Sequence, residues 1–491
     1  MKGDRVRLKK ARKKARTGSA SSARGLALEA LNRWEARAPD EREPIDALAG
    51  LEIARHAGVG ARDRRLFRAI FYGVIRHRLL LDFILDSFLE RPSKVPPEAR
   101  NILRSALFQL LFMDRVPASA AVNEAVNLAG ATGLAWARGL VNGVLRRIKR
   151  EDEKRGGLLA KWLPGQRFGN SNEFLSISTS HPEWMVKRWS ARLGEESSGE
   201  LCRANNKRAP FTLRVNTLLW NREDAMKFLE ENRITARACQ YSPDAIEVIS
   251  FRKAPADLPG FRQGGFQVQD EASQLVSFMV APEPGMKVLD LCAGSGGKTT
   301  HLAALSEDRA LITATDKNRE RLALLRDNLK RLKLHSVNVA DFRQVMNNAG
   351  RHSFSFDRVL VDAPCSGLGV IRRRPDIKWN RGPDDIERLA ALQLELLETA
   401  AAMCRAGGTV VYAVCSFEKE ETCGVISSFL AKHGEWEVKD AAGLLPGRAA
   451  SLAEDGSLLA LPWRHGTDGF FAAALSRKND SSQVKTLKPP A

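Results

Sequence analysis

The sequence has no apolar run close to the roughly 20 residues that a membrane-spanning helix needs. Its first residues also lack the apolar core of a secretory signal. The seven cysteines form no C-x-x-C pair and no zinc-ligand spacing with the eight histidines. These absences argue against a membrane protein, a structural metal site and a disulfide framework. We therefore expect a soluble cytoplasmic protein that keeps free thiols and needs no metal.

Positive charge is abundant instead, with 77 Lys and Arg against 58 Asp and Glu and a formal net charge of +19. Ten of these basic residues lie within residues 1–24, where Asp4 is the single acid, so this segment alone contributes +9. It shows no apolar periodicity, which predicts a disordered basic tail over residues 1–22; residues 479–491 are predicted to form a second tail. A transit peptide is an alternative that lacks the expected amphipathic face. The remaining +10 indicates a polyanionic partner for the folded part.

Residues 23–155 show helical periodicity without strand-like alternation. Apolar side chains recur at or near i, i+3, i+4 and i+7 in three stretches, which contain Phe67, Ile70, Phe71, Val74 and Ile75, then Leu103, Ala106, Leu107, Leu110 and Leu111, and finally Val141, Val144, Leu145 and Ile148. Such stripes, separated by "RPSKVPP" and "RVPAS", predict an all-α helical bundle with a buried core. One segment of the bundle is strongly basic, either as an RNA-binding face, which we prefer, or as an ordinary soluble surface; it holds Arg62, Arg64, Arg65, Arg68, Arg76, His77 and Arg78.

The remainder of the chain changes character twice. Residues 156–181 mix charge with Gly, Ser and Asn and are predicted to be a linker. "PFTLRVNT", a helix near residues 222–231 and "AIEVIS" then predict a small α+β RNA-binding subdomain over residues 182–267. Within residues 268–478, helical stretches alternate with the β-rich runs "MKVLDL", "ALITATD", "SVNVAD", "FDRVLVD", "GTVVYAV" and "GFFAAAL". This alternation predicts an α/β domain with a parallel, doubly wound Rossmann-like sheet that binds ligands at the carboxyl ends of its strands.

A glycine turn, "LDLCAGSGGKTTHLA", follows the first of these strands. A Walker phosphate loop would need glycine at Cys292, and a dinucleotide fingerprint would need it at Thr299, so neither motif fits. The looser glycine turn of S-adenosylmethionine-dependent enzymes remains. Asp316, at the end of the second strand, can bind both ribose hydroxyls, and Asp341, at the end of the third, can accept from the adenine amino group. Either carboxylate alone is equally well explained as a helix cap, but their succession favours the cofactor.

Two further strands end beside cysteines, because "VDAPCSGLGVIRRRPDIKW" presents Cys365 and "VVYAVCS" presents Cys415. A thiolate that adds to carbon 6 of a pyrimidine makes carbon 5 nucleophilic enough to take a methyl group, after which a second group must remove the carbon-5 proton. Two thiols on adjacent strand ends match these two tasks, and Asp362 is placed to hydrogen-bond the base. Inert packing is the alternative for each cysteine. Because a free thiol is mostly protonated at neutral pH, we expect an electropositive site that is supplied by Lys298, Arg372, Arg373, Arg374 and Lys378.

These stretches resemble the RNA cytosine-5 methyltransferases of the NOL1/NOP2/Sun family. The matching segments extend from about Ser180 to Leu475 and include "SHPEW", "TLRVN", "VQDEASQLV", "DLCAGSGGKTTHLA", "DAPCSGLGVIRRRPDIKW" and "YAVCS". The resemblance implies that Cys415 is the nucleophile and that Cys365 assists its release, with Asp362 and Lys298 as further catalytic residues. It also implies an S-adenosyl-L-methionine site made of Cys292, Ala293, Gly294, Ser295, Gly296, Gly297, Lys298, Asp316, Asp341 and Asp362.

The chain departs from the family pattern at two places. The family commonly has Ala-Pro where this chain has Gly294 and Ser295, which leaves a more flexible turn at the cofactor. It usually has Ser-Thr where this chain has Ala413 and Val414, so two hydroxyls beside the nucleophile are missing.

The helical segment, with "LVNGVLRR", is similar to the NusB antitermination domain, a fusion found in one bacterial branch of the family that modifies small-subunit ribosomal RNA. This resemblance implies a monomeric enzyme that methylates carbon 5 of a specific cytosine in 16S rRNA, without a membrane or metal partner. An amino-directed methyltransferase is a second possibility that would need neither thiol. A non-catalytic RNA-binding or ribosome-assembly factor is a third, and the presence of both cysteines together with the strand-end carboxylates argues against it.

Overall fold

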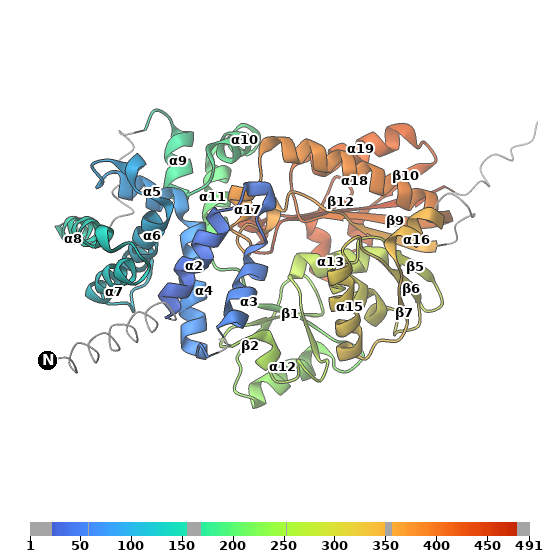
Figure 1. Ribbon diagram of the computed structural model, residues 1–491. Helices are drawn as coiled ribbons and strands as arrows, with labels where there is room; N and C mark the ends of the chain where they lie inside the picture. Colours follow the sequence, from blue (N-terminus) through green and yellow to red (C-terminus); the bar gives the residue numbers. More distant parts are fainter. Residues whose placement is uncertain (1–21, 57, 155–167, 252, 349–355, 479–491) are drawn as a thin grey trace, which may run out of the picture. The chain divides into compact units, whose positions relative to one another are not determined.

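The computed structural model describes residues 22–56, 58–154, 168–251, 253–348 and 356–478 (Figure 1). It divides into two compact units. The helical unit comprises residues 1–207 and 371–381, and the sheet unit comprises residues 208–370 and 382–491. The two predicted tails, residues 1–22 and 479–491, lie outside the described residues, apart from Ser22, whose hydroxyl caps the first described helix.

The helical unit is a bundle with an apolar core, as its periodicity predicts. Its longer helices are α2 (Ala23–Glu35), α3 (Ile45–Arg55), α4 (Ala61–Arg76), α5 (Arg78–Asp86), α6 (Pro97–Phe112), α7 (Ala118–Ala131), α8 (Arg138–Lys154), α9 (Ser171–Thr179), α10 (Glu183–Leu193) and α11 (Glu195–Asn206). The predicted stripes face inward on α4, α6 and α8, and most of their side chains are fully buried. All-helical folding of this segment is thereby confirmed.

Helix α9 lies where the sequence analysis predicted a linker. Asn170 begins it, and the Asn170 side chain accepts a hydrogen bond from the Glu173 backbone N–H. An Asn followed three residues later by Glu is a helix-start signal, and here it outweighs the polar composition of residues 156–181. The division into units also places α10 and α11 with the helical unit, although residues 182–207 were grouped with the α+β subdomain from sequence.

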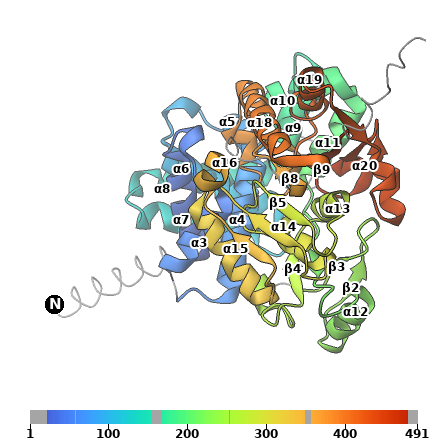
Figure 2. The same cartoon turned by 90° about the vertical axis from the view of Figure 1, so that its right-hand side faces the viewer.

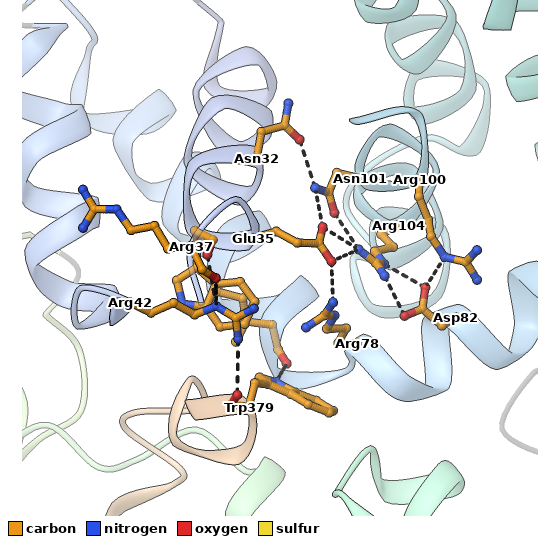
Figure 3. Close-up of polar contacts among 12 residues, drawn as sticks. Asn32, Glu35, Arg37, Arg42, Arg78, Asp82, Arg100, Asn101, Arg104 and Trp379 are labelled. Atoms are coloured by element: carbon orange, nitrogen blue, oxygen red, sulfur yellow. Dashed lines mark hydrogen bonds and ion pairs between the residues drawn. The ribbon is translucent and has the colours of Figure 1, made fainter. Parts of the chain in front are cut away.

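A network of charged groups lies inside the helical unit (Figure 3). The buried Arg104 guanidinium contacts the carboxylates of both Glu35 and Asp82, and Arg78 also contacts Glu35. Paired charges of this kind satisfy each other where water is excluded. The predicted basic face is therefore divided: Arg78 is held inside this network, whereas Arg62, Arg64, Arg65 and Arg68 are exposed on α4.

Residues 371–381, which we call the arm, belong to the helical unit although they follow Cys365 in sequence. The arm contains the short helix α17 (Ile377–Asn380). The Trp379 indole N–H donates to the Ile75 carbonyl at 2.8 Å, and the Trp379 carbonyl accepts from Arg42 at 3.2 Å (Figure 3). Lys378 is 1 % exposed and donates to the Arg76 and Ser180 carbonyls, both at 2.9 Å, and to the Asn206 side-chain oxygen at 3.0 Å.

The sheet unit is built on a large mixed sheet with the order β11-β12-β13-β9-β8-β5-β6-β7, and β10 also pairs with β13. Its strands are β5 (Lys287–Asp290), β6 (Leu311–Ala314), β7 (Val337–Val339), β8 (Phe356–Asp362), β9 (Cys404–Val414), β10 (Trp436–Lys439), β11 (Ala453–Glu454), β12 (Ser457–Ala460) and β13 (Phe470–Arg477). The stretch from β7 to β9 is parallel, as predicted. The last predicted parallel strand, "GFFAAAL", forms β13. It runs antiparallel to β9, so the parallel part of the sheet ends at β9. Antiparallel strands at the edge of a parallel sheet are common in folds of this class.

Helices cover both faces of this sheet (Figure 1). One apolar core forms beneath α13 (Glu271–Val280), α14 (Gly297–Leu305) and α15 (Arg319–Leu332). The other forms beneath α16 (Phe342–Asn348), α18 (Pro383–Met403) and α19 (Cys423–Lys432). The short helix α20 (Pro462–His465) precedes β13. This doubly wound arrangement confirms the predicted Rossmann-like fold class.

A second, smaller antiparallel sheet has the order β2-β3-β1-β4. It comprises β1 (Thr212–Val215), β2 (Ala236–Ala238), β3 (Ala245–Val248) and β4 (Phe266–Val268), with α12 (Arg222–Glu231) packed on it. In both views α12 and β2 lie at the end of the sheet unit away from α18 and α19 (Figure 2). None of the described helices is long and apolar enough to cross a membrane.

Candidate active site

The strand order turns back at β5, because β6 and β7 extend from one side of it and β8 and β9 from the other. In an open parallel sheet, ligands bind in the crevice beyond the carboxyl ends of the strands at such a point. The predicted site residues Asp316, Asp341, Asp362, Cys365 and Cys415 all follow or end these strands. The topology thus brings them to one edge of the sheet.

The glycine loop after β5 makes a sharp turn that contains two glycines with positive φ angles. Gly294 and Gly296 have φ angles of +56° and +86°, a region that glycine enters without strain. A Cβ atom on Gly296 would lie 2.2 Å from the flexible end of the Leu325 side chain on α15, so the positive φ angle, more than this contact, favours glycine here. Cys292 lies partly buried and Ala293 buried between the strand and the loop, while Ser295 is exposed at its tip and Gly297 begins α14.

Asp316 closes this loop from the neighbouring strand. Its carboxylate accepts the Gly294 N–H at 2.9 Å and the Asn318 N–H at 2.7 Å. Asp290, the last residue of β5, accepts the Thr299 hydroxyl at 2.7 Å through one oxygen, while the second oxygen is buried and has no hydrogen-bond partner in the part of the chain that the structure describes. Burial raises the pKa of Asp290 to about 7. The loop therefore offers two carboxylates and a turn without side-chain bulk, which fits the polar part of a nucleoside cofactor.

Asp341 follows β7, and its contacts lie at the starts of α15 and α16. Its carboxylate accepts the Arg343 N–H at 2.9 Å at the start of α16 and forms an ion pair of 3.5 Å with Arg319. This is the helix-cap geometry that the sequence analysis gave as the alternative. The structure places Asp341 after β7, the outermost strand on this side, with no contact to the glycine loop among the hydrogen bonds of the described residues.

Lys298 and Asp362 form a buried ion pair across the site. The Lys298 ammonium lies 2.6 Å from the Asp362 carboxylate and 4.7 Å from the centre of the Phe470 ring. Lys298 is 6 % exposed, whereas the Asp362 side chain keeps about a third of its surface exposed. The first turn of α14 therefore fixes the orientation of the carboxylate that ends β8, and leaves one side of that carboxylate open.

The two predicted thiols are in contact. Cys365 lies three residues beyond β8 and Cys415 one residue beyond β9, and their Sγ atoms are 3.2 Å apart. The strands pair with Asp362 opposite Ala413, and the Gly369 N–H donates to the Cys415 carbonyl at 3.1 Å. The hydrogen bond with Cys415, together with burial, raises the pKa of Cys365 well above its ordinary value. Cys365 is therefore protonated at neutral pH.

Two of the five basic residues expected to make the site electropositive, Lys298 and Lys378, have partners other than a thiol. The pKa of Cys365 is raised rather than lowered, and Lys298 pairs with Asp362. Lys378 is wrong as a thiol-activating or phosphate-binding residue, because three oxygen acceptors of the helical unit surround its buried ammonium. Arg374 pairs with Asp376 at 3.3 Å. The sequence predicted a role in the site for this basic string, whereas tertiary contacts within the helical unit hold Lys378 in a buried position.

Sequence reasoning missed Glu421, a buried carboxylate that contacts the residue after each thiol. It accepts hydrogen bonds from the Ser366 and Ser416 hydroxyls, at 2.5 Å and 2.6 Å. The repetition of Cys-Ser in "PCS" and "VCS" shows a hydroxyl beside each thiol, but nothing local in the sequence marks Glu421 as the acceptor of both.

Arg214 of β1 was missed as well. Its buried guanidinium donates to the Thr300 hydroxyl at 2.8 Å and to the Gly297 carbonyl, and burial lowers its pKa to about 9. It lies in the "TLRVN" string and joins the small sheet to the start of α14.

A cavity of about 720 Å³ opens elsewhere in the sheet unit. It is lined by β2, β3 and the loops near Pro446 and His465. None of the predicted site residues contributes to its lining. The strand ends, rather than this cavity, carry the candidate chemistry.

Comparisons with known proteins agree with this architecture. Residues 277–476 match the family model described as 16S rRNA methyltransferase RsmB/F, residues 21–150 match the NusB family, and residues 181–253 match the ferredoxin-like domain of the RsmF/B-like methyltransferases. A probable ribosomal RNA small subunit methyltransferase B of Bacillus subtilis (strain 168) is 32% identical over 459 residues, which are 93% of this chain and 99% of that protein.

Two further similarities extend the comparison. The ribosomal RNA small subunit methyltransferase B of Pseudomonas putida is 38% identical over 423 residues, 85% of this chain and 91% of that protein. The crystal structure of a methyltransferase homolog protein from Pyrococcus horikoshii has a TM-score of 0.53 at 27% identity and covers 63% of this chain and 100% of that one. Both the N-terminal helical domain and the methyltransferase domain thus have known relatives.

Proposed function

Because this chain belongs to the ribosomal RNA small subunit methyltransferase B family, we propose that it transfers a methyl group from S-adenosylmethionine to carbon 5 of a cytosine in 16S rRNA. The finer parts of this proposal are the cytosine, the carbon-5 position and a covalent cysteine intermediate. They are supported by the residues at the strand ends and by the resemblance to the NOL1/NOP2/Sun family.

The glycine loop and Asp316 would hold the cofactor. The positive φ angles at Gly294 and Gly296 let the backbone of the turn approach a ligand closely, and the buried Asp290 oxygen has no hydrogen-bond partner among the described residues. When bound, S-adenosylmethionine supplies an electrophilic methyl group on a sulfonium. The ion pair with Lys298 keeps the Asp362 carboxylate turned to the site, where its open side can accept a hydrogen bond from the cytosine amino group.

The two thiols carry out different steps, the addition to the base and the release of the product. The Cys415 thiolate adds to carbon 6, which forms an S–C bond and makes carbon 5 nucleophilic. After methyl transfer a base accepts the carbon-5 proton, the C–H electron pair forms the double bond between carbons 5 and 6 again, and the S–C bond breaks to return the Cys415 thiolate. Cys365, 3.2 Å from Cys415, assists this release as the thiolate that accepts the proton, so it first gives up the proton that it carries in the resting site. The contact between the two thiols is the observation that carries the proposal.

Trapping the intermediate tests it. With small-subunit rRNA and cofactor, Cys365→Ala should accumulate a protein–RNA species that survives a denaturing gel, because the adduct forms but is not released. Cys415→Ala should neither methylate nor crosslink. Cys423→Ala, which changes an exposed thiol at the start of α19, is the matched control and should behave like the wild type. Methylation that persists in Cys415→Ala would refute the covalent mechanism and favour direct, amino-directed transfer.

A further inference from the structure

Glu421 is a carboxylate without exposed surface at the end of a 3₁₀ turn, Lys419–Glu421. Burial of a carboxylate is costly unless its lone pairs accept hydrogen bonds. Four donors meet this requirement. One oxygen accepts the Ser366 N–H at 2.7 Å and the Gln393 amide at 3.0 Å, and the other accepts the Ser366 and Ser416 hydroxyls. All four donors are neutral groups, and three of them come from residues that directly follow a thiol.

The two serines connect this carboxylate to the thiols through one peptide unit each. Ser366 follows Cys365 in the loop after β8, and Ser416 follows Cys415 at the end of β9. Their hydroxyls are 3.3 Å apart and share one Glu421 oxygen. One side chain therefore fixes both loops at the position where the two sulfur atoms come within 3.2 Å.

The surroundings of Glu421 leave it little freedom. Gln393 of α18 also donates to the Pro364 carbonyl at 2.9 Å. The Tyr412 hydroxyl of β9 lies 2.6 Å from the Glu421 carbonyl and 2.9 Å from the Gln393 side-chain oxygen. These side chains are all buried. A satisfied buried network of this kind holds a single geometry.

We propose that Glu421 is a positioning residue that holds Cys365 and Cys415 in contact through Ser366 and Ser416. This inference rests on the proposed cysteine chemistry. Since Glu421 acts through the two serines, its loss should slow the chemical steps and leave RNA binding unchanged.

Glu421→Gln keeps the side-chain volume but replaces one accepting oxygen with an amide that donates. A misplacement of about 1 Å at a reacting group can lower a rate by roughly 100-fold. We expect kcat to fall by about 10- to 100-fold while KM for rRNA stays within about twofold. In a Cys365→Ala background the covalent adduct should form more slowly by the same factor. Glu420→Gln, the same change on the partly exposed neighbouring residue, is the control and should leave both rates unchanged.

Thiol proximity can be read without RNA or cofactor. Diamide takes up two hydrogens from two neighbouring thiols, which join as a disulfide. In the reduced wild type we expect a Cys365–Cys415 disulfide by peptide mass mapping, and in Glu421→Gln we expect it to form about tenfold more slowly. If Glu421→Gln lowers the unfolding midpoint, Ser416→Ala serves as the test variant instead, because it removes a single hydroxyl. The rate of disulfide formation is then expected to be three- to tenfold lower than in the wild type.

Equal disulfide rates in wild type and variant, or no disulfide in the wild type, would overturn the proposal. A kcat of Glu421→Gln equal to that of the wild type would do the same. These results are separable from a failure of the proposed function, which would appear as methylation by Cys415→Ala whatever Glu421 does.

Discussion

Lys378 in the helical unit and Glu421 in the sheet unit are both buried charged side chains that neutral groups surround. The partners of Lys378 are ends of helices: Arg76 is the last residue of α4, Ser180 follows α9, and Asn206 is the last residue of α11. Helix C-termini leave carbonyls without partners and carry a partial negative charge, so an ammonium stabilises the Arg76 and Ser180 carbonyls, while the Asn206 contact is to its side-chain oxygen. Glu421 instead binds the residues beside two reactive thiols.

The comparison of these two side chains indicates that a buried charge serves folding in one place and the geometry of the site in the other. Lys378 closes three helices and ties the arm into the helical bundle, which is a contribution to folding. Glu421 fixes two loops that the parallel strands β8 and β9 leave side by side, which is a contribution to the geometry of the site. The burial of a charge alone does not distinguish these uses; the identity of the bonded partners does.

The largest expected difference between the two buried charges is the effect of their removal on the free energy of unfolding. Lys378→Ala leaves one buried and two partly buried oxygen acceptors without this donor, and an unsatisfied buried group costs about 1–3 kcal/mol. We expect the free energy of unfolding of the helical unit to fall by about 3 kcal/mol, measured as the shift of its transition in urea. At a temperature where the variant is folded, kcat should stay within about threefold of the wild type.

The control for this change is Lys187→Ala, because the Lys187 side chain on α10 is 57% exposed and pairs only one turn away with Glu183. Exposed pairs of this kind contribute about 0.5 kcal/mol or less. A loss of kcat in folded Lys378→Ala as large as that expected for Glu421→Gln would remove the distinction between the two buried charges.

A substitution at Gly369, which contacts the Cys415 backbone, tests the same geometry by a second route. A Cβ atom on Gly369 would lie 2.2 Å from the Gly469 carbonyl oxygen and 2.9 Å from the Cys415 carbonyl oxygen, both backbone atoms. Gly369→Ala must therefore shift the chain beside Cys415, and we expect kcat to fall by roughly tenfold. Gly443→Ala, where an added Cβ meets no atom within 4 Å, is the matched control. Methylation by Gly369→Ala at the wild-type rate would show that the thiols tolerate displacement of this loop.

Much of this architecture could be predicted from sequence, and the failures have physical causes. The parallel strands from β5 to β9 were found because each is a short β-rich run between helical stretches, and β8 and β9 are also buried, largely apolar runs. Strands β11 and β12 were missed although Asp455 and Gly456, with φ angles of +50° and +74°, form the Asp-Gly turn that marks a hairpin. β2 and β10 are short edge strands whose composition is not distinctive.

The site divides in the same way. The carboxylates and thiols were found because each lies at a strand end, which periodicity locates. Glu421 was not found, because its hydrogen bond to Ser366 joins residues 55 positions apart and forms only when the chain folds. The burial of Lys378 was also unpredictable, because a lysine in a basic string is expected at the surface and only the ends of three separate helices determine otherwise.

The smallest predicted effect is a pH dependence that belongs to the helical unit. His77 stacks on Phe112 with ring centres 4.2 Å apart, and burial, followed by the charges of Lys378 and Arg76, lowers the pKa of His77 to about 3. Its unfolded value is about 6.5, so the stability associated with neutral His77 is complete above pH 6.5 and is lost as the pH falls toward 3. His77→Phe should abolish this loss, which amounts to about 1 kcal/mol at pH 6, whereas the same change at the exposed His335 should not. Urea unfolding at pH 5.5, 6.5 and 7.5 measures it, and an acid dependence of His77→Phe as steep as that of the wild type would assign the effect to other groups.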